Sequence, residues 1–131
     1  MRERPDLISD QSPGGIEVHQ LTTEPIPSSH IYMEAQIFTP DSRRLILHRS
    51  AHPHGSNPED PAHQYLVCDL DKAGQMFPIT TELGATAPSI APQGDVLYYF
   101  INATEPGVGG RLTLKRVRLD GTSREEICAI D

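Results

Sequence analysis

The segment QIFTPDSRRLILHRS, residues 36 to 50, decides the fold class because a turn separates its two apolar runs. Pro40 presets the φ angle of the second residue of a turn, and Asp and Ser are common turn residues. Two short apolar runs joined by such a turn predict a β-hairpin. The same arrangement returns in SIAPQGDVLYYFIN, residues 89 to 102.

These two segments belong to a repeat that covers most of the chain. Three pairs of segments match in the same order: FTPDSRRLIL (38–47) with IAPQGDVLYY (90–99), YLVCDLDKAG (65–74) with LKRVRLDGTS (114–123), and HQLTTE (19–24) with PITTEL (78–83). The first match places Pro92 on Pro40, 52 positions later, and Gly94 on Ser42. The second places Leu119 on Leu70, 49 positions later. A repeat of this length with four short strands is typical of a β-propeller blade.

Short apolar runs with alternating polarity dominate the chain after residue 15, and Gly, Pro, Asn or Asp separates nearly all of them. They are IEVHQL, AQIF, RLILH, QYLVCDL, VLYYFI, LTLKRVRL and EEICAI. No sustained helical period is present, so we predict an all-β chain. The predicted organisation is a polar N-terminal tail at 1–15, a first four-stranded antiparallel blade at 16–80, and a second at 81–131. An ordinary β-sandwich with similar hairpins is the alternative fold.

Two loops of different length connect the predicted hairpins, RSAHPHGSNPEDPAH at 49–63 and NATEPGVGG at 102–110. Two blades do not close a ring, since propellers have about 4–8 blades. An isolated pair would leave apolar blade faces in water. We therefore expect the two blades to belong to a larger propeller, or to self-associate through the exposed faces.

The acidic composition limits the classes of partner. The formal net charge is −7 and the sequence pI is about 5.2, which argues against nucleic acid and anionic membranes as partners. An anionic substrate stays possible, because seven of the 11 basic residues form two groups. The groups are Arg43, Arg44 and Arg49, and then Arg111, Lys115, Arg116 and Arg118.

No apolar leader opens the chain, and no run approaches the roughly 20 apolar residues of a membrane span. The predicted location is cytoplasmic. Cys68 and Cys128 lie in apolar strand-like segments, LVCDL and EEICAI. Buried, reduced thiols are the expectation for both.

Three residues are predicted to bind substrate. His30 and Tyr32 lie just before the FTPD strand, and the innermost strand of a blade and the loop leading into it line the channel of a propeller. Arg49 can offer bidentate hydrogen bonds to a carboxylate. For His30, a structural role within the fold is the alternative.

Four of the six histidines gather in one region, at His48, His52, His54 and His63. Histidine is a common metal ligand, but no known zinc spacing is present, and solvated loop histidines are the alternative. The chain also lacks a G-x-S-x-G segment and a phosphate-binding glycine loop. We predict no metal site, no cofactor and no catalytic residue within this chain.

Two segments, FTPDSRRLIL and APSIAPQGDVLYYF, resemble the F/S-P-D-G-x-x-L motif of TolB-like propeller repeats. More specifically, VHQLTTEPIPSSHIYMEAQIFTPDSRRLILHR and QYLVCDLDKAGQMFPIT resemble the N-terminal region of oligogalacturonate lyases. The likeness spans about residues 16 to 128.

The resemblance implies a seven-bladed propeller that cleaves oligogalacturonides by β-elimination during pectin breakdown. A base removes the C5 proton, while Mn²⁺ or another divalent metal and arginines neutralise the uronate carboxylate. In that family the metal-binding and catalytic residues come from later blades, and no counterpart is present in this chain. We therefore expect this chain alone to be inactive.

The chain departs from the family pattern at three places. Ser42 stands where the family has Gly, Gln93 stands where Asp is usual, and the loop at 50–63 is longer than expected. These departures leave the fold unchanged and put the substrate in question. The alternatives are a non-catalytic TolB-like interaction module and a propeller hydrolase whose catalytic part lies elsewhere. Sequence downstream of residue 131 would separate them.

Overall fold

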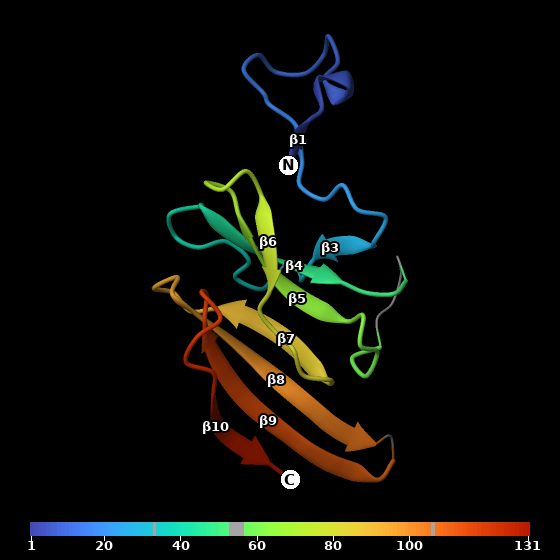
Figure 1. The fold of residues 1–131 in the computed structure, drawn as a ribbon, viewed down its shortest axis with the longest axis vertical. Coiled ribbons are helices and arrows are strands. Elements are labelled where there is room, and N and C mark those ends of the chain that lie inside the picture. The colour runs from blue at the N-terminus through green and yellow to red at the C-terminus, as the bar shows by residue number, and fades with distance from the viewer. Residues whose placement is uncertain (33, 53–56, 106) are drawn as a thin grey trace.

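The computed structural model describes residues 1–32, 34–52, 57–105 and 107–131. Within these ranges the chain is built from β-strands, and its one helical element is a short 3-10 turn, η1 (Pro5–Leu7). The strands form three antiparallel sheets of two, four and four strands (Figure 1). The prediction of an all-β chain with two four-stranded antiparallel units is confirmed.

Each four-stranded sheet is a meander in which every strand pairs with the next strand along the chain. The first sheet contains β3 (Ser28–His30), β4 (Arg44–Arg49), β5 (Gln64–Asp69) and β6 (Gln75–Pro78). The second contains β7 (Ala85–Ile90), β8 (Val96–Glu105), β9 (Gly109–Arg118) and β10 (Glu125–Ile130). The two sheets fall within the two ranges predicted for the repeat units.

The N-terminal segment is tied to the chain that precedes the first sheet. β1 (Arg2–Glu3) pairs antiparallel with β2 (His19–Gln20). Figure 1 shows this segment projecting beyond the first sheet. The polar segment predicted as a tail therefore begins with a short strand.

The two turns that define the repeat have the same backbone geometry. The Ser42 N–H donates a 2.8 Å hydrogen bond to the carbonyl of Thr39, and the Gly94 N–H donates one of the same length to the carbonyl of Ala91. The φ angles of Ser42 and Gly94 are +57° and +79°, a region that favours glycine. The alignment of Ser42 with Gly94 therefore holds in three dimensions.

The first strand of each sheet is irregular, which the sequence pattern did not indicate. AQIF, 35–38, was predicted as a strand, but only Phe38 forms a bridge, to Leu45. β3 lies earlier, and residues 31–32 and 34–36 have no pairing with β4. Ile37 accepts a 2.9 Å hydrogen bond from the Ile46 N–H, which marks the return to β4. β7 carries a register shift between Thr86 and Ser89. With the 52-residue spacing, that shift aligns with residues 34–37.

The prediction of a loop over 102–110 is wrong at both ends, because β8 extends to Glu105 and β9 begins at Gly109. Glycine makes this close approach possible. A Cβ atom on Gly110 would lie 2.4 Å from the carbonyl oxygen of Ala103, so any larger residue would separate the strands.

The two four-stranded sheets pack face to face over one apolar core. The first sheet contributes Ile46, Tyr65 and Val67, and the second contributes Leu97, Tyr99 and Val117. A second, smaller cluster on the other side of the first sheet consists of Leu45, Leu47 and Cys68, with Leu21, Leu70 and Met76 packed against it.

The repeat alignment shows that the sheets are stacked head to tail. We define face A as the side of Ile46, Tyr65 and Val67, which align with Tyr98, Leu114 and Arg116 of the second sheet. Face B is the side of Leu45, Leu47 and Cys68, which align with Leu97, Tyr99 and Val117. Face A of the first sheet therefore packs on face B of the second.

The two cysteines have different surroundings, and the prediction that both are buried is wrong for Cys128. Both are free thiols, but Cys68 is fully buried and Cys128 is exposed. Cys128 lies on the edge strand β10 and pairs with Leu114 on face A of the second sheet. No strand among the described residues covers that face.

None of the described residues belongs to a helix with the length and apolar character needed to cross a bilayer.

Candidate functional site

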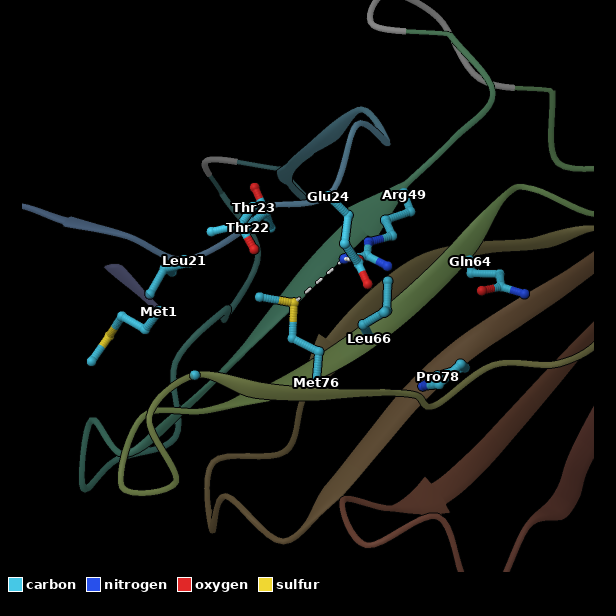
Figure 2. A pocket seen from close by; sticks show the side chains of 11 residues that line it. Met1, Leu21, Thr22, Thr23, Glu24, Arg49, Gln64, Leu66, Met76 and Pro78 are labelled. Carbon is cyan, nitrogen blue, oxygen red and sulfur yellow. Dashed lines mark hydrogen bonds and ion pairs between the residues drawn. The ribbon is translucent and has the colours of Figure 1, made fainter. Parts of the chain in front are cut away.

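Arg49 lies in a pocket of about 290 Å³ on face B of the first sheet. Its side chain is 15% exposed and forms an ion pair with Glu24, while its Nη2 atom lies 4.0 Å from the sulfur of Met76. The Arg49 Nε atom is buried and has no hydrogen-bond partner among the described residues. Figure 2 shows Glu24 and Arg49 side by side, with Met76 close to the guanidinium.

Tyr32 lies at a different place, in a pocket of about 420 Å³ between the two sheets. Its lining residues come from the segment after β3, from β5 and from the irregular part of β7: Ile31, Tyr32, Glu34, Ala35, Tyr65, Thr86, Ala87, Pro88 and Ser89. We call this the Tyr32 pocket.

The three residues predicted to bind substrate are not brought together. Arg49 and Tyr32 line separate pockets. His30 is exposed at the end of β3, where it pairs with Leu47, and it lines neither pocket. A single site built from all three is therefore not present.

Local backbone strain accompanies the Tyr32 pocket. Ala87 has a φ angle of +48°, which is uncommon for a residue with a side chain. Such a conformation costs roughly 1–2 kcal/mol and persists only where the surroundings impose it. It lies in the register shift of β7, so Ala87 and Pro88 have no partner in β8. Bulges of this kind are frequent next to binding sites.

A histidine pair lies beside this pocket, and the sequence pattern did not reveal it. His48 Nε2 lies 3.1 Å from Nδ1 of His63, and His63 Nε2 lies 2.7 Å from the carbonyl oxygen of Ala85. Since a carbonyl only accepts, neutral His63 carries its proton on Nε2. His48 must then donate from Nε2 to Nδ1 of His63. This relay connects β4 to the first strand of the second sheet.

Both histidine rings pack against Tyr65, with ring centroids 5.3 Å and 5.2 Å from it. Burial lowers the pKa of His48 to about 4, and the nearby His63 adds to the effect. Burial also raises the pKa of Tyr65 to about 12. His48 and Tyr65 are therefore both uncharged near pH 7, and the two imidazole rings hold the Tyr65 ring in place.

The histidines do not gather as one loop cluster. His48 is part of β4, His63 is buried just before β5, and His52 is exposed. His54 lies outside the described residues. Among the described residues, no group of three or more His, Cys, Asp or Glu side chains is positioned to hold a metal ion.

A second polar network joins the chain before β7 to the second sheet. Glu82 accepts a 2.9 Å hydrogen bond from Lys115 Nζ, another of 2.9 Å from Arg124, and one of 3.1 Å from the Tyr99 hydroxyl. Arg124 also donates to the carbonyl oxygen of Ile79 at 2.8 Å. Burial alone would raise the pKa of Glu82, but the bonds from its partners hold it below its ordinary value.

This network has a counterpart in the first repeat. LTTE, 21–24, aligns with ITTE, 79–82, which places Glu24 on Glu82. Glu24 pairs with Arg49 and Glu82 pairs with Lys115, so each glutamate ties the segment before a sheet to that sheet. The Arg49 contact is therefore a structural anchor, which lowers its value as a substrate ligand.

The Tyr32 pocket is therefore the candidate binding site. Its aromatic ring, hydroxyls and carboxylate line a cavity, whereas the charges of Arg49 and Glu24 pair with each other. No protein-family model and no curated protein matches this chain.

Proposed function

We propose that this chain forms two adjacent blades of a larger β-propeller and contributes to its ligand-binding scaffold, with oligogalacturonate lyase as the enzyme class. The head-to-tail stack of the two sheets is the observation that carries the propeller assignment. The sequence resemblance over about residues 16 to 128 supplies the enzyme class.

The stacking direction favours a propeller over a sandwich. Two similar sheets related by a two-fold axis would bring equivalent faces together. Here face A of one sheet contacts face B of the next, as Ile46 and Leu97 illustrate. A contact of this kind can be repeated by every further unit, and it closes into a ring if the rotation allows. Propeller blades pack in this way around a channel.

The strand order supports a position for the Tyr32 pocket on the channel side of the proposed propeller. β3 and β7 are the first strands of the two meanders and lie at corresponding edges. In a propeller these first strands are innermost, so the Tyr32 pocket lies on the channel side. Ligands bind propellers on that side, which supports a binding role for these two blades.

The chemistry of β-elimination requires groups that the described residues do not assemble. The reaction needs a base at C5 and a cationic environment for the uronate carboxylate. The divalent metal of the lyase family has no set of three ligands here, and the His48 and His63 nitrogens are engaged with each other. No step of the elimination is therefore assigned to a residue of this chain.

An elimination assay tests the enzyme class. Oligogalacturonate and Mn²⁺ are mixed with the chain alone and with any longer polypeptide encoded by the same reading frame. We expect no rise in unsaturated-uronate absorbance with the chain alone and a metal-dependent rise with the longer protein. A rise with the chain alone would overturn the view that the active site lies elsewhere. No rise with the longer protein would overturn the lyase assignment and leave the propeller untouched.

The second candidate is a non-catalytic TolB-like interaction module. The uncovered face A of the second sheet favours it, because Ile130 at its edge is 62% exposed. In this role the propeller would bind a protein partner rather than a pectin fragment. Activity of the longer protein on oligogalacturonate separates the two candidates.

A further inference from the structure

We propose that the Tyr32 pocket binds a neutral, hydroxylated ring, the chemistry of an uncharged sugar residue. This inference goes beyond the proposed function, which assigns no ligand to a residue of this chain. It does not depend on ring closure or on lyase activity, because the lining residues come from the two sheets and from the segment that joins β3 to β4.

The position of the pocket is set by two coincident irregularities. Residues 31–32 and 34–36 have no pairing with β4, and Ala87 and Pro88 have none with β8. These two departures align in the repeat, and residues from both segments line the same cavity. The cavity of about 420 Å³ falls in the range of small-molecule sites, about 300–1,000 Å³.

The lining provides one aromatic surface and several polar groups. Tyr32 is 59% exposed, so its ring is available for stacking on an apolar ring face. Thr86 and Ser89 carry hydroxyls that both donate and accept hydrogen bonds. Glu34 carries a carboxylate, which accepts strong bonds from ligand hydroxyls.

The back of the pocket is preorganised. Tyr65 is 6% exposed, and its ring is held by His48 and His63 from the side. His63 in turn is fixed to the carbonyl of Ala85 in β7. A binding surface whose side chains are already locked loses less entropy when a ligand arrives.

The charge of the lining selects a neutral ligand. Among the described residues, Glu34 is the single charged residue of the lining, and no Lys, Arg or His of that part of the chain lines the pocket. A carboxylate close to Glu34 would be repelled, so a uronate should bind less tightly than its uncharged analogue. A quaternary ammonium would be attracted by Glu34 but would leave the hydroxyls of Thr86 and Ser89 unused.

The test is an NMR titration of the ¹⁵N-labelled chain with D-galactose and with D-galacturonate, two rings that differ at C6. We expect saturable shifts of the Tyr32, Thr86 and Ser89 amides with galactose and weaker binding of galacturonate. Tyr32→Ala should weaken galactose binding about fivefold, whereas Tyr32→Phe should retain it, because the ring face makes the contact. Leu83→Ala is the matched control, since Leu83 is 57% exposed and lies outside the pocket.

Three results would overturn the proposal. The first is galactose binding that Tyr32→Ala does not change, or shifts that do not include the pocket amides. The second is galacturonate binding as tight as that of galactose. The third is choline producing the pocket shifts while both sugars do not. Tyr32 is largely exposed, so the alanine variant should keep the dispersed spectrum of the folded chain.

Discussion

His48 shows how a single buried residue links this fold to pH. It lies in β4 and donates to His63, which donates to the carbonyl of Ala85. Burial holds the pKa of His48 at about 4, against about 6.5 for an unfolded histidine. Between these values the unfolded chain binds more protons than the folded chain.

We therefore expect the free energy of unfolding to be complete above pH 6.5 and to fall as the pH drops from about 6.5 toward 4. The loss should be on the order of 1–2 kcal/mol, a discounted value because His48 is only half buried. Urea unfolding at pH 7.5 and at pH 5 measures it. His48→Gln should flatten the dependence in this interval, and an unchanged slope in that variant would contradict the assignment. Glu82, whose pKa is held low, contributes a further loss only at lower pH.

Much of the candidate site could not be predicted at the residue scale. Tyr32 was found because it precedes a predicted inner strand, and Arg49 because a guanidinium suits carboxylates. The His48–His63 contact and the Glu82 network join residues 15 to 45 positions apart. No local pattern encodes such contacts, since they depend on how the sheets stack. RLILH alternates in a way that places His48 on the same face as Ile46, which is the one local signal for its burial.

At the scale of elements, the two repeat turns offer a matched pair of substitutions. Ser42 has a φ angle of +57°, which glycine adopts without strain. Ser42→Gly should therefore raise the free energy of unfolding by relieving this strain. The entropy that glycine adds to the unfolded chain offsets part of the gain, which leaves a net increase of about 0.5–1 kcal/mol.

Gly94→Ser, the reverse change at the aligned position, should lower the free energy of unfolding by more than Ser42→Gly raises it. A Cβ atom on Gly94 would lie 2.3 Å from Cδ of Pro40, in the turn of the other sheet. Gly94→Ser thus combines backbone strain with a clash between the two turns. Thermal unfolding of both variants checks this prediction, and a harmless Gly94→Ser would mean that the turns are not in contact.

The elements themselves were predicted with uneven success, for identifiable reasons. β4, β5, β8, β9 and β10 follow the apolar runs closely, because central and well-patterned strands obey the two-residue period. The strand predicted at AQIF is wrong because Ala35 and Gln36 do not pair with β4. The loop predicted at 102–110 is wrong because glycines let β9 begin at Gly109, close to the end of β8. Both failures concern the backbone, where a side-chain pattern carries little information.

For the whole molecule, the head-to-tail stack leaves two outer sheet faces, one partly covered and one open. Face B of the first sheet is partly covered by Leu21 and Met76. Face A of the second sheet is open, and its residues are only half buried or exposed: Tyr98, Phe100, Leu112, Leu114, Cys128 and Ile130. The repeat alignment alone indicated that such a face would exist, whereas which face is open required the structure.

This open face leads to a prediction about association. We expect the isolated chain to self-associate as its concentration rises, because the exposed apolar residues at the Leu112 and Ile130 end of face A favour contact with another surface. Sedimentation velocity over a range of concentrations measures the shift from monomer to larger species.

Ile130→Lys should move the chain toward monomer, since it places a charge on face A next to Leu112. Val108→Lys is the control, because Val108 is 79% exposed at the β8–β9 turn and lies outside the face. A chain that stays monomeric at every concentration and unfolds in one sharp transition would contradict the open-stack view and favour a closed sandwich. Equal effects of the two lysine substitutions would instead place the contact elsewhere on the surface.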